Sequence, residues 1–194
     1  YDIASKKIMP YWQYHGIRKI DKVIISHNDY DHFGALEELS ELIEIKEVIK
    51  ETDQVKLGKI TLYNLNNYYN ENSDENDRSM VLYGQIGKMN YLFTGDMSVN
   101  IEKKIIQNYA YLPVDVLKVA HHGSDTSTSK EFIRFINPQY AIISVGANNK
   151  YGHPSDYVIK TLENERIKIY RTDIFGTIRI KGKIINLWYV ETAK

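Results

Sequence analysis

Short apolar runs alternate with amphipathic segments along most of the chain. Residues 22–26 (KVIIS) form an apolar run that predicts a buried strand. Residues 31–43 then carry apolar side chains on one helical face and glutamates on the other, which predicts an amphipathic helix. The same reasoning predicts helices at 9–15, 99–109, 129–136 and 155–164, and strands at 47–50, 60–65, 80–86, 91–94, 114–120, 140–145 and, in three parts, 167–190.

The order of these elements indicates the class of fold. Strands alternate with helices early in the chain and pair with one another at its end, around turns expected near residues 175–176 and 182–183. Residues 66–78 are rich in Asn, Asp and Glu and lack periodicity, which predicts an exposed loop. Such an order is typical of a layered domain of sheet and helices.

Composition narrows the possibilities further. The chain has 194 residues, which predicts a single domain over residues 1–194. Its 25 basic and 25 acidic residues balance, so net charge gives no general argument for nucleic acid binding. Cysteine is absent, which excludes disulfides, thiolate nucleophiles and thiolate metal sites. No apolar run suits a membrane span, no signal peptide is recognisable, and the first residue is Tyr1, so we expect a piece of a longer chain.

Polar side chains gather directly after four of the predicted strands. The stretch SHNDYDH (26–32) follows one strand, TGD (94–96) a second, HHGS (121–124) a third, and YGHPS (151–155) a fourth after a short loop. In open α/β sheets, ligands bind beyond the carboxyl ends of strands. Imidazole and carboxylate groups in this mixture suit Zn²⁺, Mn²⁺ or Fe, and the acidic groups suffice for two ions that lower the pKa of a bound water.

The joint pattern is similar to that of one protein family. His27-x-Asp29-x-Asp31-His32 resembles the HxHxDH signature of the metallo-β-lactamase fold, with Asp29 in place of its second histidine. With FTGD, LKVAHHGS, NNKYGHP and RTDIFGTI, it resembles the metallo-β-lactamase-like domain of ComEC-type DNA-internalisation competence proteins over about residues 11–180. The resemblance implies an α/β fold, a four-layer αββα sandwich.

The chain departs from the family pattern in two places. The two opening strands and the early aspartate of the family are missing, so the first sheet is expected to lack its usual first strands. Many metallo-β-lactamases also carry a mid-chain histidine ligand. No histidine lies between His32 and His121 here, and NDRS (76–79) occupies that region, as it does in the ComEC-like group.

The resemblance implies a role for each ligand-type residue of the first two clusters. His27 and Asp29 would hold one divalent ion, and Asp31 and His32 would hold a second. Asp96 would bridge the two ions, and Asp31 is also expected to act in catalysis. Because Asp29 replaces a histidine, the first site is richer in oxygen, which favours Mn²⁺ while Zn²⁺ remains plausible.

The last two clusters complete the expected site. At least one of His121 and His122 would be a metal ligand, and the sequence does not choose between them. His153 would be catalytic, binding phosphate or donating a proton to the leaving group, although a structural role before Pro154 is supported equally well. Ser124 is expected to bind substrate. Asn149 is a further candidate for phosphate binding, with an ordinary turn residue as the favoured interpretation.

Each cluster also has a simpler interpretation. Asp29 or Asp31 would cap a helix, with the histidines merely exposed, and Asp96 would cap the helix expected near Ser98. Loop tyrosines such as Tyr151 would stack on bases or pack locally. The four clusters together favour the metal site over these separate explanations.

The hypothesis is a metal-dependent phosphodiesterase, a nuclease domain that acts on single-stranded DNA during DNA uptake through a dinuclear metal-activated water. The resemblance implies a soluble domain of a bacterial membrane-associated competence protein, on its extracellular or cytoplasmic face, with DNA and the rest of that protein as partners. One alternative is a metal-dependent esterase of a small phosphodiester such as choline-phosphate, which the neutral net charge favours. The other is a non-catalytic interaction module of a DNA-uptake complex.

Overall fold

The computed structural model describes residues 3–69, 73–182 and 188–193. The chain forms two compact units, Tyr1–Thr52 and Asp53–Lys194. Among the described residues, every sheet lies within one unit, so each unit has its own strand pairing. No helix in the described part of the chain has both the length and the apolar character that a membrane crossing requires.

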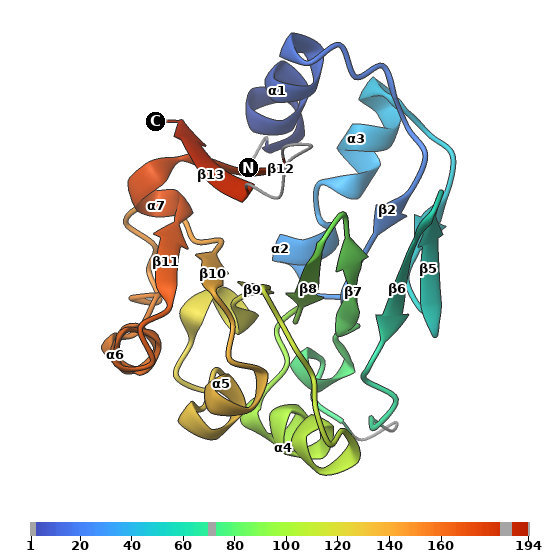
Figure 1. Ribbon diagram of the computed structural model, residues 1–194. Helices are drawn as coiled ribbons and strands as arrows, with labels where there is room; N and C mark the ends of the chain where they lie inside the picture. The colour runs from blue at the N-terminus through green and yellow to red at the C-terminus, as the bar shows by residue number, and fades with distance from the viewer. Residues whose placement is uncertain (1–2, 70–72, 183–187, 194) are drawn as a thin grey trace. The chain divides into compact units, whose positions relative to one another are not determined.

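The first unit combines short helices with two small parallel sheets (Figure 1). In one sheet β1 pairs with β3, and in the other β2 pairs with β4, both in parallel. The predicted strands at 22–26 and 47–50 are confirmed in shortened form. The elements are a π-helical turn η1 (Ala4–Ile8), α1 (Met9–Tyr14), β1 (Lys19–Ile20), β2 (Val23–Ile24), α2 (Tyr30–Phe33), α3 (Leu36–Leu42), β3 (Glu44–Ile45) and β4 (Val48–Ile49).

The prediction of one continuous helix over residues 31–43 is wrong in one respect, because the helical segment is divided in two at Gly34. The Gly34 nitrogen donates to the Tyr30 carbonyl at 2.7 Å and ends α2. A Cβ at Gly34 would lie only 2.5 Å from that carbonyl oxygen, so the close approach requires glycine. The amphipathic pattern therefore identified the helical region but not this break.

The second unit is built on a seven-stranded sheet in the order β11-β10-β9-β8-β7-β6-β5. Strands β8, β9, β10 and β11 run parallel to one another, and β5 to β8 form an antiparallel meander. A separate antiparallel hairpin joins β12 to β13. The strands are β5 (Gln54–Leu57), β6 (Ile60–Asn64), β7 (Leu82–Ile86), β8 (Met89–Phe93), β9 (Val116–Lys118), β10 (Tyr140–Ile143), β11 (Lys168–Arg171), β12 (Thr177–Gly182) and β13 (Trp188–Ala193).

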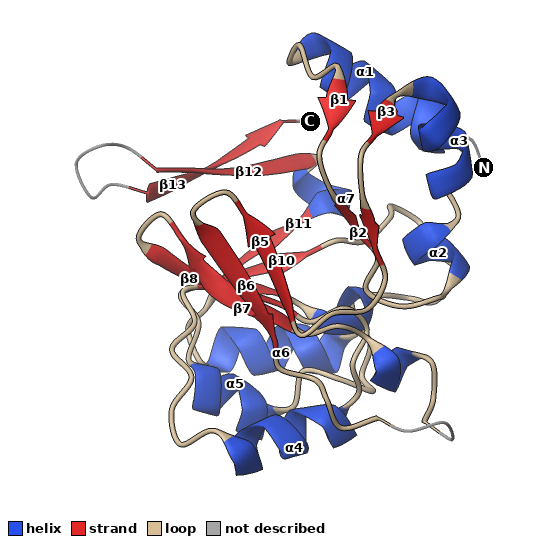
Figure 2. Ribbon diagram, turned by 90° about the vertical axis from the view of Figure 1, so that its right-hand side faces the viewer, coloured by secondary structure: helices blue, strands red, loops and turns tan. Residues whose placement is uncertain are grey.

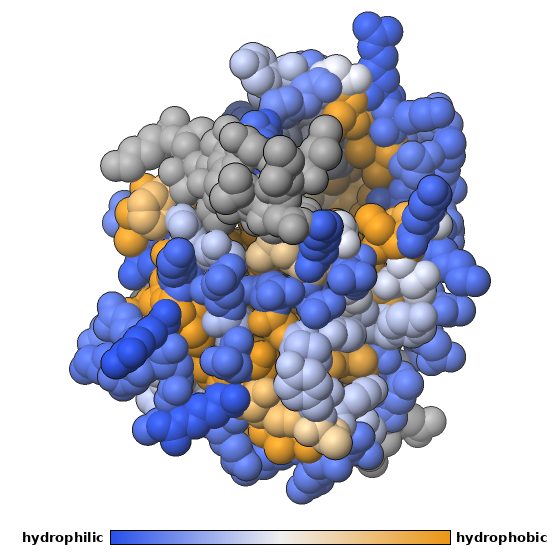
Figure 3. Space-filling model, viewed as in Figure 1, coloured by the Kyte–Doolittle hydropathy of each residue, from blue (hydrophilic) through white to orange (hydrophobic). Residues whose placement is uncertain are grey.

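Helices cover one face of this sheet. Figures 1 and 2 show α4, α5 and α6 side by side beneath the strands, and side chains such as Leu92, Ile101, Phe132 and Leu162 form the core between the two layers. Figure 3 shows a hydrophilic surface over α6. Nearer to α4, apolar and polar side chains are mixed on this face. The helices are η2 (Asn76–Arg78), α4 (Val99–Asn108), η3 (Ala120–Gly123), α5 (Lys130–Ile136), α6 (Asp156–Asn164) and α7 (Thr172–Phe175).

The mixed α/β class predicted from the sequence is confirmed, with a large central sheet and helices packed on it. The pattern missed β1, β3 and β5, because the first two span two residues each and β5 (QVKL) is largely exposed. The turn predicted near residues 182–183 lies partly outside the described residues. The loop at 66–78 is not simply exposed, because Asn66 is fully buried and its amide donates to the carbonyls of Asp77 and Ser79, both at 2.8 Å.

Candidate metal centre

In the first unit, the loop after β2 brings two histidines and two aspartates together as pairs. The Ser26 hydroxyl lies 3.0 Å from Nδ1 of both His27 and His32, and the two rings are 4.1 Å apart at their centroids. Nε2 of His27 lies 3.5 Å from Oδ2 of Asp29, and Nε2 of His32 lies 3.8 Å from Oδ2 of Asp31. Because the serine oxygen can accept from both Nδ1–H groups, both Nε2 atoms are then left as ligand atoms beside a carboxylate.

Asp29 occupies the N-cap position of α2, but its side chain makes no capping hydrogen bond. Its carboxylate is directed instead towards the buried His27, which is only 4% exposed. The geometry of this loop therefore does not favour the simple capping interpretation of the HxDxDH stretch.

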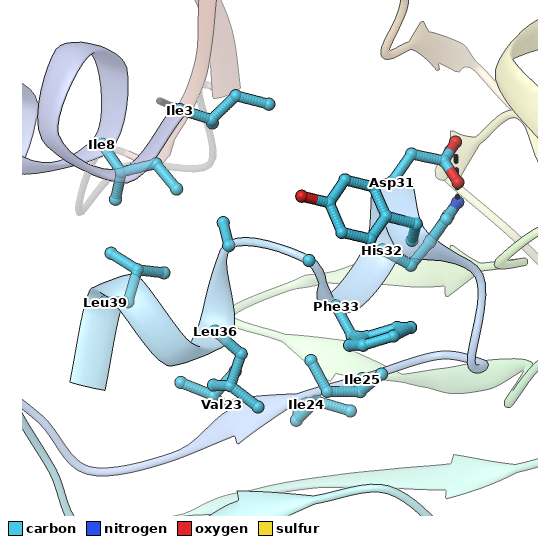
Figure 4. A pocket seen from close by; sticks show the side chains of 13 residues that line it. Ile3, Ile8, Val23, Ile24, Ile25, Asp31, His32, Phe33, Leu36 and Leu39 are labelled. Carbon is cyan, nitrogen blue, oxygen red and sulfur yellow. Dashed lines mark ion pairs between the residues drawn. The ribbon is translucent and has the colours of Figure 1, made fainter. Parts of the chain in front are cut away.

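An apolar pocket of about 410 Å³ adjoins these residues within the first unit. Figure 4 shows the Asp31–His32 pair at one end of the pocket, with Phe33 between that pair and the side chains of Leu36 and Leu39 on α3. Side chains of η1 and β2 complete the lining. The packing of α2 and α3 against β2 thus places Asp31 and His32 at the polar rim of an apolar space.

In the second unit, Asp96 lies in the turn after β8 and is 3% exposed. Its backbone nitrogen donates to the Ser79 hydroxyl at 2.9 Å. Its Oδ2 lies 3.7 Å from Nε2 of His122 and 4.0 Å from Nε2 of His121, and its Oδ1 lies 3.8 Å from Nζ of Lys118. The carboxylate is therefore directed into a cluster of cationic and imidazole groups.

Helix α4 does not use Asp96 as its cap. The N-cap is Ser98, whose hydroxyl accepts from the Asn100 nitrogen at 3.1 Å. Serine caps α5 and α6 in the same way, through Ser129 and Ser155. The capping explanation of Asp96 is therefore wrong, and its carboxylate remains available for another role.

The two histidines of the HHGS stretch adopt an unusual backbone conformation. His121 has φ 47° and His122 has φ 53°, both in the left-handed region that side chains with a Cβ rarely occupy. Hydrogen bonds hold the turn, because the His121 nitrogen donates to the Gly95 carbonyl at 3.2 Å and the Ser124 nitrogen donates to the His121 carbonyl at 2.8 Å. Backbone strain held in this way is typical of functional sites.

The hydrogen bonds of the two imidazoles distinguish them. Nδ1 of His122 lies 2.7 Å from the Ser144 carbonyl oxygen. Because a carbonyl only accepts, this nitrogen carries the hydrogen, and Nε2 of His122, which faces Asp96, carries the lone pair. Nδ1 of His121 makes only a longer contact, 3.3 Å to the Thr126 hydroxyl. The structure therefore favours His122 as the better oriented ligand, a choice that the sequence left open.

Gly123 is expected to be essential to this turn. Its φ is +86°, and a Cβ there would lie 2.5 Å from Cβ of Pro154. We expect Gly123→Ala to lower the free energy of unfolding by roughly 2–4 kcal/mol, because backbone strain and overpacking add. Thermal unfolding and Zn²⁺ affinity measure the effect.

Gly152→Ala provides the matched control. Gly152 also has a positive φ, +70°, but a Cβ there would meet nothing within 4 Å. We expect this control to lose only about 1–2 kcal/mol, from strain alone. Equal losses in the two variants would show that the contact with Pro154 is unimportant.

The loop that carries His153 is fixed by Asn149. The Asn149 amide donates to the His153 carbonyl at 2.7 Å and to the Gly146 carbonyl at 3.1 Å, and its oxygen accepts from the His153 nitrogen at 2.9 Å. The His153 ring lies 5.8 Å from that of His121. Burial, followed by the nearby His121 and His122, lowers the pKa of His153. The loop thus places His153 beside the histidine turn, and Asn149 engages both amide hydrogens within the loop. Their roles towards substrate stay predictions.

Ser124 is buried, at 4% exposed, and its hydroxyl lies 3.0 Å from that of Thr126. The same oxygen accepts from the Thr126 nitrogen at 3.3 Å. These contacts stabilise the turn after the two histidines. Substrate binding by Ser124 stays a prediction.

Glu102 is a buried acid that the sequence analysis did not single out. It lies on α4, is fully buried, and accepts from the backbone nitrogens of Thr128 and Ser129, the latter at 3.0 Å. Burial raises the pKa of Glu102, and the hydrogen bonds from Ser129 and Thr128 partly oppose this. The residue ties α4 to the end of the loop that begins with the histidine turn.

The raised pKa of Glu102 predicts a pH dependence of stability. Between the ordinary glutamate pKa and the raised native value, the folded state binds more protons than the unfolded state, so stability falls as pH rises through that window. Glu102→Gln has no such titration. We therefore expect the free energy of unfolding of the wild type, relative to Glu102→Gln, to be highest at low pH and to decline with rising pH. Urea unfolding of both proteins across roughly pH 4–8, the range above the ordinary glutamate pKa, measures this dependence. A stability of the wild type relative to Glu102→Gln that grows with pH would contradict the prediction.

The donor atoms fit divalent metal ions. In each of the three His–Asp pairs that involve His27, His32 and His122, nitrogen and oxygen are 3.5–3.8 Å apart. Two ligands bound at about 2.1 Å to one tetrahedral ion lie about 3.4 Å from each other. Small shifts of the side chains would therefore place an ion between the members of each pair. The identity and number of the ions, and the ligand set itself, stay predictions.

Several residues around the clusters were not assigned a role from the sequence. Ser26 and Ser79 orient ligand-type residues, and Lys118 places a positive charge beside Asp96. The signals were present in the quoted stretches, because Ser26 opens SHNDYDH, Ser79 closes NDRS and Lys118 belongs to LKVAHHGS. Such supporting residues commonly fix the orientation of metal ligands.

Comparisons with known proteins identify relatives of the chain. The family model of the metallo-beta-lactamase superfamily matches residues 2–75. The chain is 30% identical to ComE operon protein 3 of Bacillus subtilis over 94% of its own length and 27% of that protein. It is also 30% identical to competence protein ComA of Neisseria gonorrhoeae, over 91% of the chain and 27% of that protein.

Two further matches extend the comparison. Recombination protein 2 of Haemophilus influenzae is 28% identical over 92% of the chain and 24% of its own length, so the chain spans about a quarter of these curated relatives. Among solved structures, a CmlA beta-hydroxylase mutant matches with a TM-score of 0.55 and 13% identity, over 79% of this chain and 43% of that one, which supports the fold alone. Residues 2–75 thus match the metallo-β-lactamase superfamily, and most of the chain is similar to a segment of ComEC-type competence proteins.

Proposed function

We propose that the chain is a metal-dependent phosphodiesterase that acts as a nuclease on single-stranded DNA. In this proposal residues 1–194 form one metallo-β-lactamase-like domain. The proposed ligands of two divalent ions, Zn²⁺ or Mn²⁺, are His27, Asp29, Asp31, His32, Asp96 and at least one of His121 and His122. The observation that carries the proposal is the repeated pairing of an imidazole Nε2 with a carboxylate oxygen at 3.5–3.8 Å.

The residues of the chain would divide the work as follows. The carboxylates of Asp31 and Asp96 would bind the metal ions and fix their positions. Asp31 would also orient the attacking water. Divalent ions bound there would lower the pKa of that water and neutralise charge on phosphate oxygens. His153, beside the histidine turn, would bind a phosphate oxygen or donate a proton to the leaving group. Ser124 completes the proposed substrate contacts, and Asn149, whose amide hydrogens are engaged within its loop, would act by holding His153 in place.

The proposed substrate and setting follow from the relatives. One relative is named a competence protein and another a recombination protein, which supports DNA as the substrate class. We infer that the domain belongs to a bacterial membrane-associated protein and works with the remainder of that protein during DNA uptake. The neutral net charge gives no general attraction to DNA, so other segments of the longer protein would help to deliver the strand.

A substrate panel tests this function directly. The purified chain would be assayed with Mn²⁺ or Zn²⁺ on labelled single-stranded DNA and on bis(p-nitrophenyl) phosphate, a small diester. We expect cleavage of both, since metal-activated attack on phosphorus does not depend on the bases. Cleavage of the small diester alone would support an esterase of small phosphodiesters. Turnover of neither, in a folded and metal-loaded chain, would support the non-catalytic module.

A further inference from the structure

A second pocket, within the second unit, is lined by four tyrosines among its ten lining residues. Tyr63, Tyr83, Tyr109 and Tyr111 line a cavity of about 420 Å³ between the end of β6, the start of β7 and the segment after α4. None of the residues that line it belongs to the cluster around Asp96. A cavity of this volume is in the range that binds small molecules. The pocket is therefore a candidate binding site that shares no residue with the proposed metal centre.

Hydrogen bonds hold the walls of this pocket in place. The Tyr83 hydroxyl donates to the Pro113 carbonyl at 3.0 Å. The Asn64 nitrogen donates to the Asp53 carbonyl at 2.8 Å, and the Asn64 side-chain oxygen accepts from the Val81 nitrogen at 3.0 Å. A site whose walls are already fixed requires less ordering when a ligand binds.

Two of the rings remain open to a ligand. Tyr63 is 54% exposed and Tyr111 is 76% exposed, whereas Tyr83 and Tyr109 are partly buried against the core. The pocket thus has two anchored aromatic walls and two accessible ones. Aromatic faces carry a partial negative charge that attracts cations.

The described residues that line the pocket carry negative charge and no positive charge. Asp53 alone is charged among the described residues that line the pocket, and no cationic side chain of the described chain pairs with its exposed carboxylate. A groove for nucleic acid would be expected to present Lys or Arg to the phosphates, and this lining has neither. Tyrosine faces beside an unpaired carboxylate favour a cationic ligand instead.

We propose that this pocket binds an organic cation, an alkylammonium or guanidinium group, with the tyrosine rings around the cation and the Asp53 carboxylate as its counter-charge. The site is independent of the metal centre and of the proposed nuclease activity. The cation would be carried by a small alkylammonium molecule or by the arginine side chain of a partner protein.

Ligand-observed ¹H NMR titration of the purified chain tests the proposal. The probes are tetramethylammonium, methylguanidinium, the neutral tert-butanol and thymidine. We expect a cation to bind with upfield shifts of its methyl protons, because ring currents shift protons held over aromatic faces, and tert-butanol to bind at least about fivefold more weakly. Tighter binding of tetramethylammonium would indicate a small alkylammonium ligand, and tighter binding of methylguanidinium an arginine side chain.

Variants make the assignment specific. We expect Asp53→Asn and Tyr111→Leu each to weaken cation binding about fivefold, and Tyr111→Phe to stay within about twofold, because phenylalanine keeps the aromatic face. Glu131→Gln, at an exposed acid outside the pocket, is the control and should bind normally. Circular dichroism checks that each variant is folded. Equal binding of tert-butanol and the cations, equal effects of Tyr111→Phe and Tyr111→Leu, no effect of Asp53→Asn, or tighter binding of thymidine than of either cation would overturn the proposal.

Discussion

Replacement of Asp96 by alanine is expected to lower metal-dependent phosphodiester hydrolysis by about a thousandfold or more. The carboxylate is 3% exposed and lies within 4.0 Å of nitrogen atoms of His121, His122 and Lys118. As the proposed bridging ligand it would contribute to both ions, so its loss removes the group that holds them at a fixed separation. Initial rates with Mn²⁺ and Zn²⁺ on a small diester and on single-stranded DNA measure the effect.

Asp125→Ala is the matched control for this substitution. Asp125 is an exposed acid of the loop that follows the histidine turn, and it has no proposed ligand role. We expect the Asp125→Ala variant to hydrolyse phosphodiesters at a rate within about threefold of the wild type, because exposed charges have small effects. An Asp96→Ala variant that is folded and still cleaves at the wild-type rate would refute the proposed centre.

Replacement of His122 by alanine is expected to weaken metal binding by about 100-fold or more, and replacement of His121 by about tenfold at most. The difference follows from the hydrogen bonds of the two rings. Nδ1–H of His122 donates to the Ser144 carbonyl at 2.7 Å and fixes Nε2 towards Asp96, whereas the contact of His121 with Thr126 is longer, at 3.3 Å. Competition with a chromogenic Zn²⁺ chelator gives both affinities.

Backbone effects need a separate control at these two positions, because both histidines have positive φ. Asparagine tolerates that conformation well, so His121→Asn and His122→Asn remove each imidazole with less added strain. We expect the same order of metal affinities in the asparagine pair as in the alanine pair. A larger loss at His121 in both pairs would show that His121 is the principal ligand.

The sequence predicted the parts of the site that depend on residue type and spacing. The histidines and aspartates of residues 26–32 could be recognised from the sequence as ligand-type residues. In the structure His27 lies near Asp29 and His32 near Asp31, the pairs that the family resemblance implied. The strands β2, β8, β9 and β10 were also found where apolar runs indicated them. Runs of apolar residues and local polar clusters are short-range features, which a sequence displays directly.

The rest depended on contacts between distant segments. The proposed preference for His122 over His121 rests on the Ser144 carbonyl, which lies 22 residues from His122 along the chain. Glu102 looked like an ordinary polar residue of an amphipathic helix, yet it is fully buried and accepts two backbone hydrogen bonds from the end of the loop at Thr128 and Ser129. A periodicity pattern contains no information on such partners, so these roles became visible only in the folded chain.

The most direct test of the proposed centre is anomalous diffraction from a crystal of the chain grown with Mn²⁺, recorded for the wild type and for Asp96→Ala. The account predicts two manganese peaks in the wild type, bound by His27, Asp29, Asp31 and His32 together with Asp96 and His122, and the loss of at least one peak in the variant. Absence of manganese from a folded wild-type chain, or manganese bound only by other residues, would contradict it.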